Sequence, residues 1–402
     1  MTGPPAGDGP LDWLGAALAD LERADLSRSL RHHTSGAEPW IDLETPEGLR
    51  RLLHLCSNGY LGLATHPEVV AAAVEAAQRL GTGSGSARLV TGGQTPHREL
   101  EETLADWKGT DDALLFSSGY LANLGVVTAL AGRGDVVVSD ELNHASIVDA
   151  CRLARAEVRV YRHGDADHAA ALLADAPDGA RRLLVTDGVF SMDGDVAPLP
   201  ALCDVAERHG AAVIVDDAHG SGVLGPEGRG TAAALGCEDR IHAVVATLSK
   251  ALGSVGGYVA GSADLTAWLR NRARPFVFDT ALPPPAVAAA RAAITVVRRE
   301  PERRERALRL ARDLADGLRA AGHAVAAPDA CIVPVVVGSN RAALDGMARL
   351  LEHDVLAVAI RPPSVAPGSA RLRATVMATH TDDDIDRAVG AFRDALATAD
   401  AS

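Results

Sequence analysis

Seven short β-type segments alternate with alanine-rich helical segments between about residues 65 and 275, and this alternation constrains the fold more than any other feature of the chain. It predicts βαβ units and a mainly parallel sheet with helices on both faces. Ligands of parallel sheets bind at the carboxyl ends of the strands, so we expect the functional site where these segments end. The β-type segments are Ala113 to Phe116, Val136 to Val138, Val158 to Tyr161, Leu183 to Thr186, Val213 to Val215, Val244 to Leu248 and Gly257 to Ala260.

The rest of the chain predicts a smaller α+β unit and an N-terminal arm. Apolar residues from Leu11 to Leu30 recur at helical spacing, which predicts a helix that packs on something larger. We expect an arm over residues 1–60 that packs with the small domain, a large α/β domain over 61–280, and a small domain over 281–402. For the small domain the pattern predicts long helices through about residue 321, a strand over Ile332 to Val337, a helix near 340–353, strands near 355–360 and 371–376, and a helix from about 382.

Charge and cysteine content narrow the range of partners. The formal charge of −14 argues against nucleic acid, because phosphate binding needs a basic surface. An anionic substrate must then meet a local arginine cluster. The five cysteines are odd in number and lack CxxC spacing, so they indicate neither a disulfide framework nor a zinc site. We expect no metal, and a reducing cytoplasm as the location.

No segment has the pattern of a leader or of a membrane span. The first ten residues lack both a basic region and an apolar region, so no secretory signal is expected. The uncharged stretch from Ala113 to Gly132 is long enough for a membrane helix, but serines, glycines, Asn123 and Thr128 dilute it. This stretch therefore predicts a buried strand, a turn and a helix.

Lys250 is one of two lysines in the chain and follows an apolar β-type run, just before a glycine-rich turn. Asp216 ends an earlier run of the same kind. An aspartate and a lysine at two strand ends indicate an aldehyde cofactor, because the carboxylate can pair with a ring nitrogen and the amine can react with the aldehyde. Taken alone, Lys250 is equally well explained as a leftover lysine, and Asp216 as a helix cap or part of a surface turn.

Residues near these two fit the same kind of ligand. His219 can donate a hydrogen bond to a ring oxygen, and Thr247 can offer its hydroxyl to a phosphate. The turn Ser117-Ser-Gly-Tyr-Leu-Ala-Asn123 lies between a strand and a helix, so the amides of Gly119 and Tyr120 can form a positive cup for that phosphate. Each feature alone has an ordinary explanation: a polar loop residue, a β-forming residue and a plain turn.

Two more loops and one arginine-rich strand complete the candidate residues. His144 follows a predicted strand, where its ring can stack on a flat cofactor or cap a helix. Ser191 lies in another loop after a strand and can reach the cofactor, while the residues after it make a turn. Arg371 and Arg373 can share one face of a strand, where a guanidinium binds a carboxylate through two hydrogen bonds. Surface arginines are the alternative explanation.

Taken in order along nearly the whole chain, these segments resemble the α-oxoamine synthases, which are pyridoxal-phosphate (PLP) enzymes of the fold-type I superfamily. The resemblance implies an aspartate aminotransferase-like α/β fold, with a mainly parallel seven-stranded sheet between helices and a smaller C-terminal α+β domain. It rests on Ser57-Asn-Gly-Tyr-Leu-Gly-Leu63, Gly83-Ser-Gly-Ser-Ala-Arg-Leu-Val-Thr-Gly92, the turn at Gly119, Asn143-His-Ala-Ser146, Val189-Phe-Ser-Met-Asp-Gly-Asp195, Asp216-Asp-Ala-His-Gly220, Thr247-Leu-Ser-Lys250 and the arginine strand.

The resemblance also implies roles for individual residues. Lys250 would bind PLP covalently, Asp216 would pair with the pyridine nitrogen, and His144 would stack on the ring. Arg373 would take the amino-acid carboxylate, and Thr280 would reach the PLP phosphate of the partner in a homodimer. The implied catalytic residues are Lys250, His144, Asp216 and His219; the remaining cofactor residues are Gly119, Tyr120, Ser191 and Thr247; the remaining substrate residues are Asn58, Ser364 and either Arg28 or Arg31.

The segments Ala359-Ile-Arg-Pro-Pro-Ser-Val365 and Ala370-Arg-Leu-Arg373 are similar to those of the biotin-pathway branch of that family. This implies an acyltransferase that joins L-alanine to pimeloyl-CoA or to a pimeloyl carrier protein, with loss of CO2. The alternatives are a sibling enzyme that uses glycine and acetyl-CoA, an aminotransferase of the same fold, and a non-catalytic cofactor-binding regulator. Two residues depart from the family pattern, because Asp187 stands where glutamate is more usual and Ser364 where threonine is.

Overall fold

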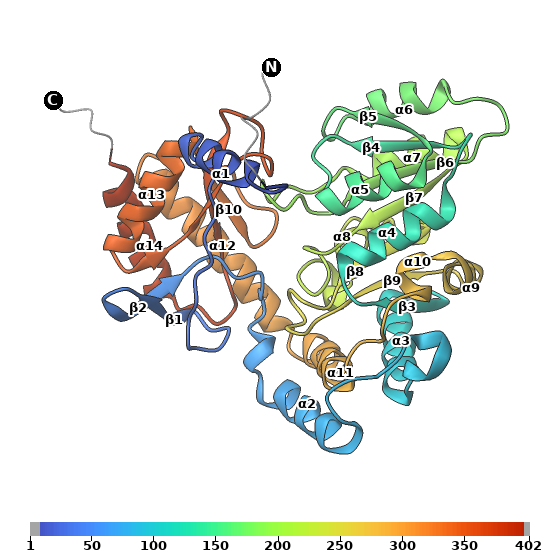
Figure 1. Ribbon diagram of the computed structural model, residues 1–402, viewed down its shortest axis with the longest axis horizontal. Coiled ribbons are helices and arrows are strands. Elements are labelled where there is room, and N and C mark those ends of the chain that lie inside the picture. Colours follow the sequence, from blue (N-terminus) through green and yellow to red (C-terminus); the bar gives the residue numbers. More distant parts are fainter. Residues whose placement is uncertain (1–8, 398–402) are drawn as a thin grey trace.

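The computed structural model describes residues 9–397 and consists of two bodies that lie side by side (Figure 1). Most of the opening segment, where no secretory signal is expected, and the last residues of the predicted small domain lie outside this range. Within residues 9–397, none of the helices combines the length and the apolar character needed to cross a bilayer. The uncharged stretch forms a strand, a turn and a helix as predicted, β3 (Asp112–Phe116) and α4 (Gly119–Leu130).

The seven predicted β-type segments pair in one sheet, which forms the centre of the large body. Its strand order is β3-β9-β8-β7-β6-β4-β5. The five strands from β8 to β5 run parallel, and β9 is antiparallel to both of its neighbours, so the predicted mainly parallel seven-stranded sheet is confirmed. The other strands are β4 (Val136–Asp140), β5 (Glu157–Tyr161), β6 (Arg182–Asp187), β7 (Ala211–Asp216), β8 (Ala243–Thr247) and β9 (Gly257–Gly261).

Apolar residues on both faces of the strands explain why helices cover the sheet twice. In β7, Ile214 packs into one core while Val213 and Val215 pack into the other, because successive side chains of a strand point to opposite faces. One face carries α4, α5, α9 and α10, and the other carries α6 and α7, with α3 and α11 over β3 and β9. Their bounds are α3 (Thr95–Lys108), α5 (Ala145–Ala154), α6 (Ala166–Ala174), α7 (Leu199–His209), α9 (Ala263–Arg272), α10 (Arg274–Val277) and α11 (Pro284–Arg299); the short α8 (Thr231–Ala234) follows β7.

The small body has two three-stranded sheets and its own core. One sheet has the order β10-β13-β12 and the other β1-β2-β11. The strand predicted near 355–360 is divided between them, because β11 pairs with β2 and β12 pairs with β13 after the chain passes Ala357. The other predicted elements of this region are confirmed as α12 (Pro301–Ala320), β10 (Ile332–Gly338), α13 (Asn340–Glu352), β11 (Val355–Leu356), β12 (Val358–Ile360), β13 (Ala370–Thr375) and α14 (Asp382–Leu396).

The N-terminal arm differs from the expectation. Helix α1 (Trp13–Arg23) forms within the apolar stripe but buries none of its residues; Trp13 and Leu18 are 49% and 58% exposed. The expected packing of this helix therefore stays a prediction. Farther along, Arg361 donates hydrogen bonds to backbone carbonyls of the arm, at Asp25 and Ser27, so the arm does contact the small body. The sequence did not predict the hairpin of β1 (Trp40–Thr45) and β2 (Gly48–His54).

The domain limits at residues 60 and 280 stay a prediction. Helix α11, placed in the small domain by those limits, packs against α3 and α2 (Pro67–Leu80) and contributes Val287 and Ile294 to the core of the large body. Helix α12 follows directly and contributes Leu310 and Leu314 to the core of the small body. The chain therefore passes between the two bodies at the junction of these helices.

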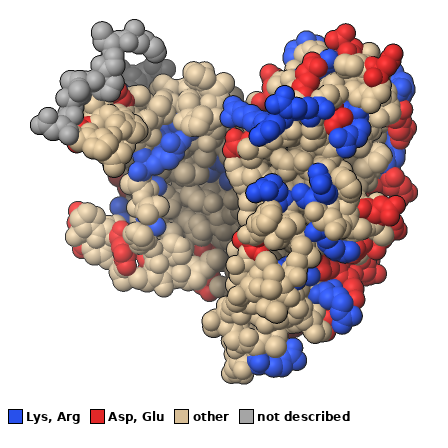
Figure 2. All heavy atoms as spheres, turned by 45° about the vertical axis from the view of Figure 1, so that its right-hand side comes forward, with Lys and Arg blue, Asp and Glu red and all other residues tan. Residues whose placement is uncertain are grey.

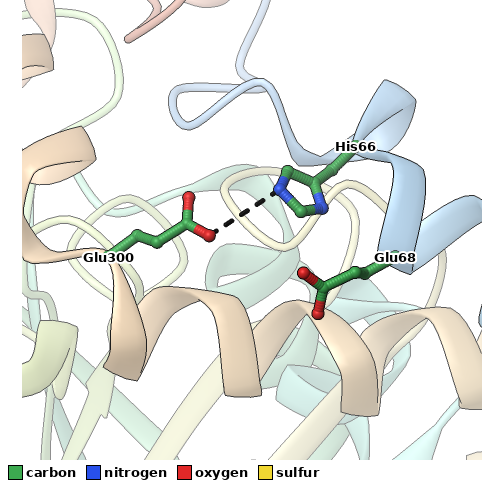
Figure 3. A group of neighbouring side chains, drawn as sticks. All are labelled: His66, Glu68 and Glu300. Atoms are coloured by element: carbon green, nitrogen blue, oxygen red, sulfur yellow. Dashed lines mark ion pairs between the residues drawn. The ribbon is translucent and has the colours of Figure 1, made fainter.

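Charged side chains hold that junction (Figure 3). His66 precedes α2, and its Nε2 lies 3.9 Å from Oε1 of Glu300, between α11 and α12. Arg299 pairs with Glu68 at 2.6 Å and with Glu300 at 2.7 Å, and Arg303 pairs with Glu300 at 2.6 Å. His66, Glu68 and Glu300 are close enough together to share a metal ion, but arginines already neutralise both carboxylates. We therefore interpret the group as an ionic junction.

A buried ion pair anchors the segment that follows β7. Nζ of Lys108, at the end of α3, donates to Oγ of Ser221 at 2.7 Å and lies 3.4 Å from Oδ2 of Asp217. Asp217 also accepts hydrogen bonds from the backbone and the hydroxyl of Thr231. A Cβ at Gly230 would lie 1.7 Å from Oδ2 of Asp217, so only glycine fits beside this carboxylate. The carboxylate therefore depends on Lys108 for charge balance.

Lys108→Met should lower the free energy of unfolding by about 3–5 kcal/mol, because Asp217 would stay buried without its cation. Urea denaturation measures this loss. The double variant Lys108→Met/Asp217→Asn should recover part of it, since the uncompensated charge is gone. Arg98→Met, on the same helix, breaks an exposed pair with Glu102 and should cost less than about 1 kcal/mol. Equal losses in the two single variants would contradict the assignment.

Candidate active site

A cavity of about 200 Å3 lies at the carboxyl ends of the parallel strands. The space-filling view shows the hollow between the two bodies on one face of the molecule (Figure 2). Every predicted cofactor residue except Thr280 lines the cavity. The lining residues are Ser118, Gly119, Tyr120, His144, Ser146, Asp187, Ser191, Asp216, Ala218, His219, Thr247, Ser249 and Lys250.

One end of the cavity is formed by the start of α4. Ser118 caps this helix by accepting a hydrogen bond from the amide of Leu121 at 3.1 Å, and the first amides of a helix have no partner within it. A Cβ at Gly119 would lie 3.2 Å from Cβ of Thr247, so glycine keeps the cup open. Thr247, at the end of β8, lies beside the cup, and its Oγ1 is 2.6 Å from Oγ of Ser249. Free amides with hydroxyls are the donor set that binds phosphate.

Two carboxyl groups lie side by side at the ends of β6 and β7. Buried Asp216 accepts hydrogen bonds from Nδ2 of Asn123 at 2.6 Å and from the amide of Ala218 at 3.0 Å, and these neutral donors do not balance a negative charge. Asp187 pairs with Asp216 in the strand register and accepts from the amide of His144 at 3.0 Å. Burial, followed by the nearby charge of Asp216, raises the pKa of Asp187 well above its usual value. Asp216 therefore remains the acceptor for a cation in the cavity.

A chain of hydrogen bonds joins Lys250 on the large body to Arg373 on the small one. Nζ of Lys250 lies 2.7 Å from Nε2 of His219, and Nδ1 of His219 lies 2.6 Å from the hydroxyl of Tyr60. Tyr60 donates to Oδ1 of Asn58 at 3.3 Å, and two guanidinium nitrogens of Arg373 donate to the same atom at 3.2 Å. With Tyr60 donating to Asn58, His219 donates through Nδ1 and accepts from Lys250 through Nε2.

Burial controls the protonation of this chain. Burial, assisted by the charge of Arg373, lowers the pKa of Lys250 to about 8, although Asp216 and Asp187 oppose the shift. Burial and the charge of Lys250 lower the pKa of His219 well below its usual value, so its imidazole is neutral near pH 7. A lysine with this pKa offers an appreciable fraction of free amine at neutral pH, which is the nucleophile that an aldehyde requires.

The two arginines of β13 are both buried but have different partners. Arg371 pairs with Asp193 and donates to the carbonyl of Met192 at 3.3 Å, so its charge is balanced within the protein. Arg373 donates to the carbonyl of Ser191 at 2.5 Å and to Asn58, which are both neutral acceptors. Arg373 is therefore the arginine of this strand whose charge is available for a substrate carboxylate.

Six predicted residues do not line the cavity in the single chain: Asn58 and Arg373, which belong to the hydrogen-bond chain described above, and Thr280, Arg28, Arg31 and Ser364. Thr280 is exposed, and its backbone pairs with Ala87. Arg28 donates to the carbonyl of Pro362 at 3.3 Å, close along the chain to the exposed Ser364. Arg31 lines a separate cavity of about 300 Å3. The structure therefore brings the cofactor residues together without deciding between Arg28 and Arg31.

The position of His144 is compatible with both roles considered for it, stacking on a flat cofactor and capping a helix. It lines the cavity, and its Nδ1 also accepts a hydrogen bond from the amide of Ser146 at 3.3 Å as the cap of α5. The cap fixes the backbone from which the imidazole reaches the cavity.

Comparison with known proteins identifies the family. The sequence pattern of "Aminotransferase class I and II" matches residues 50–392. The chain belongs to this aminotransferase family. Among its relatives, the 8-amino-7-oxononanoate synthase of Anaeromyxobacter dehalogenans is 51% identical over 94% of each chain. A solved structure of serine palmitoyltransferase with its PLP internal aldimine matches with a TM-score of 0.90 at 35% identity, covering 96% of this chain and 97% of that one. The 8-amino-7-oxononanoate synthase of Francisella tularensis matches with a TM-score of 0.73 at 26% identity, covering 85% and 97%.

These matches confirm the predicted fold class and the family resemblance. Sequence reasoning missed two residues that support the site of this aminotransferase-family protein, Tyr60 and Asn123. Tyr60 is flanked by the buried Leu61 and Leu63, and Asn123 lies within the apolar helix α4. A polar group in such surroundings needs a hydrogen-bond partner, and that signal could have marked both residues. The structure supplies the partners, His219 for Tyr60 and Asp216 for Asn123.

Lys250 should react with an added aldehyde with a midpoint near pH 8, because its amine is protonated below that pH and nucleophilic above it. An ordinary lysine, with a pKa of 10.5, would react only at higher pH. Borohydride trapping at graded pH, followed by mass spectrometry of the labelled peptides, measures the midpoint. Lys108 is an internal control that should stay unlabelled, because it is buried in an ion pair. A midpoint near pH 10 would contradict the lowered pKa of Lys250.

Proposed function

We propose that this chain is a PLP-dependent acyltransferase that condenses L-alanine with a pimeloyl thioester to give 8-amino-7-oxononanoate, a free thiol and CO2. The observation that carries the proposal is that one cavity unites Lys250, Asp216, His219 and the start of α4. PLP offers an aldehyde, a ring nitrogen, a ring oxygen and a phosphate, and each of these has a matching group here. The name of the 51% identical relative supports the choice of substrates.

The residues of the cavity fit the cofactor. The amides of Gly119 and Tyr120 and the hydroxyl of Thr247 would bind the phosphate, in a cup that a side chain at Gly119 would narrow. Asp216 would keep the ring nitrogen protonated. With the cofactor bound, Tyr60 would donate to Nδ1 of His219, so that Nε2 of His219 would carry the proton and donate to the ring oxygen. The remaining contacts would be His144 stacked on the ring, the hydroxyl of Ser191, and the amine of Lys250 at the aldehyde.

The cofactor supplies an aldehyde and an electron-accepting ring, which stabilise negative charge at the amino acid's Cα. Arg373 would hold the carboxylate of L-alanine, with Asn58 beside it. Lys250, whose pKa is about 8, can remove the Cα proton and later return one. A bond forms between Cα and the acyl carbon as the thioester C–S bond breaks, and CO2 then leaves from the same Cα. Ser364 and either Arg28 or Arg31 would contact the acyl substrate.

A homodimer forms part of the proposal. Large apolar side chains near Thr280 are exposed in the single chain: Leu89 by 55%, Val90 by 73% and Phe278 by 71%. Three large exposed apolar side chains close together indicate a surface that another protein chain covers, which in a homodimer is a second copy of this chain. Thr280 would then reach the partner's phosphate. All five cysteines are free thiols, which fits the proposed cytoplasmic location.

A second candidate activity is serine palmitoyltransferase, favoured by the TM-score of 0.90 to that enzyme. It would join L-serine to palmitoyl-CoA through the same cofactor chemistry, so substrate choice distinguishes the two. The sibling reaction of glycine with acetyl-CoA differs in the same way.

A substrate panel tests the proposal. Pimeloyl-CoA, a pimeloyl carrier protein, palmitoyl-CoA and acetyl-CoA are each combined with L-alanine, L-serine and glycine, and the products are identified by mass spectrometry. We expect L-alanine with a pimeloyl thioester to react fastest and to release CO2, and Lys250→Ala to serve as the inactive blank. If L-serine reacts best with palmitoyl-CoA, or glycine with acetyl-CoA, the biotin-pathway activity is refuted.

Arg373→Lys should raise KM for L-alanine by at least about tenfold, because an ammonium group cannot bind both carboxylate oxygens as a guanidinium fork does. The KM for the acyl thioester should change much less. Initial rates at varied concentrations of each substrate measure both constants. Arg309→Lys, an exposed arginine paired with Asp313 on α12, is the matched control. An unchanged KM for L-alanine would remove Arg373 from the carboxylate site.

A further inference from the structure

The turn from Phe190 to Asp195 lies between the two bodies. It is closed by hydrogen bonds from the amide of Phe190 to the carbonyl of Asp195 at 2.9 Å and from the amide of Gly194 to the carbonyl of Phe190 at 2.8 Å. Gly194 has a positive φ of 79°, and a Cβ there would lie 2.8 Å from the carbonyl oxygen of Ile332 in β10. Only glycine allows this close approach, so the turn packs directly on the small body.

The tip of the turn is bound by the two arginines of β13. Arg371 contacts the carbonyl of Met192 and the carboxylate of Asp193, and Arg373 donates to the carbonyl of Ser191 at 2.5 Å. Ser191 also lines the cavity. One turn therefore touches both the proposed cofactor site and the arginine proposed to hold the substrate carboxylate.

The base of the turn is held by His163, which follows β5. Its Nε2 lies 2.8 Å from Oδ2 of Asp195, and its Nδ1 lies 3.0 Å from Oδ1 of Asp140. The ring also meets Phe190 edge to face at 4.4 Å between centroids. Asp140 ends β4 and starts the loop that leads to His144. His163 thus joins the two loops that present His144 and Ser191 to the cavity.

The geometry requires a charged imidazole. A carboxylate lies on each side of the ring, and both ring nitrogens donate only when the histidine is protonated. The hydrogen bonds to Asp140 and then Asp195 raise the pKa of His163 to about 10. Glu141 is the third acid nearby and accepts from the backbone amide of His163 at 2.9 Å. Within residues 9–397, Oδ1 of Asp195 is buried without a hydrogen-bond partner, so this carboxylate relies on His163.

We propose that His163 is a positioning residue: by bridging Asp140 and Asp195 it fixes the turn that presents Ser191 to the cofactor site and a backbone carbonyl to Arg373. Loss of this bridge frees the base of the turn while its tip stays bound to the small body. The carbonyl of Ser191, to which Arg373 donates, is then no longer fixed to the large body, so the fork of Arg373 shifts relative to Lys250. The expected change in KM for L-alanine rests on the proposed function, whereas the expected change in Kd for PLP does not depend on which substrates react.

The test uses the PLP-loaded enzyme with His163→Leu, which removes both contacts, and His163→Gln, which removes the charge. We expect KM for L-alanine to rise at least about tenfold in His163→Leu, with a smaller fall in kcat. The Kd for PLP, measured by fluorescence on reconstitution, should rise by a similar factor. His168→Gln is the matched control, because His168 lies in the helix that follows and, among residues 9–397, its Nδ1 accepts only from the backbone of Arg162.

A double-variant cycle separates positioning from general stability. Asp195→Asn should reproduce part of the effect of His163→Gln on KM, and the double variant should be no worse than His163→Gln, since the contact with Asp195 is already lost in that variant. If His163→Leu does not fold, this pair carries the test. The proposal is overturned if folded variants bind PLP and L-alanine within about twofold of the native enzyme, or if the two effects add. Failure of the native enzyme to react with L-alanine and pimeloyl-CoA would instead refute the proposed function. The PLP affinity of the variants would still test the positioning role of His163.

The raised pKa gives the same test a pH dependence. A group whose pKa rises from 6.5 to about 10 on folding stabilises the folded state fully below about pH 6.5, and this stabilisation is lost as the pH rises through 10. The difference in Tm between the native enzyme and His163→Gln should therefore shrink as the pH is raised from 6 to 10. A difference that stays constant over that range would overturn the charged bridge.

Discussion

The parallel pairing of β4, β6, β7 and β8 is the constraint on which the candidate site depends. In parallel strands the carboxyl ends meet at one edge of the sheet, so residues that are far apart in the sequence lie close together in the fold. His144 follows β4, Asp187 ends β6, Asp216 ends β7 and Thr247 ends β8. Helix α4 then starts at the same edge and adds its free amides to the group.

Charge balance within the protein separates the supporting residues from the functional ones. Buried ions are stable in a protein only when they are paired or when they titrate. The paired groups are Lys108 with Asp217, His163 with Asp140 and Asp195, and Arg371 with Asp193. Asp216 and Arg373 contact neutral partners, and Lys250 responds to burial with a lowered pKa. The cavity is therefore set up for a ligand that brings the missing charges.

The site also depends on contact between the two bodies. Lys250 reaches Arg373 through His219, Tyr60 and Asn58, and the Ser191 turn touches β13 from the other side. A ligand that meets both Lys250 and Arg373 must span this contact. The junction between α11 and α12, held by Arg299 and Glu300, sets where the chain crosses from one body to the other. Small shifts between the bodies would change the reach of Arg373 directly.

The sequence by itself determined the seven strands, the helices between them and the family, and it predicted the cofactor residues, because apolar periodicity and motif order are local properties. It predicted Lys250, Asp216, His219 and Thr247 as one group from their positions at strand ends. The hairpin β1–β2 and the split between β11 and β12 depend on pairing with distant strands, which periodicity does not report. Only the tertiary structure decided that Arg371 pairs with Asp193 while Arg373 stays available, and that Tyr60 and His163 bridge separate elements. Hydrogen bonds and ion pairs between distant residues are set by packing, so no local pattern encodes them.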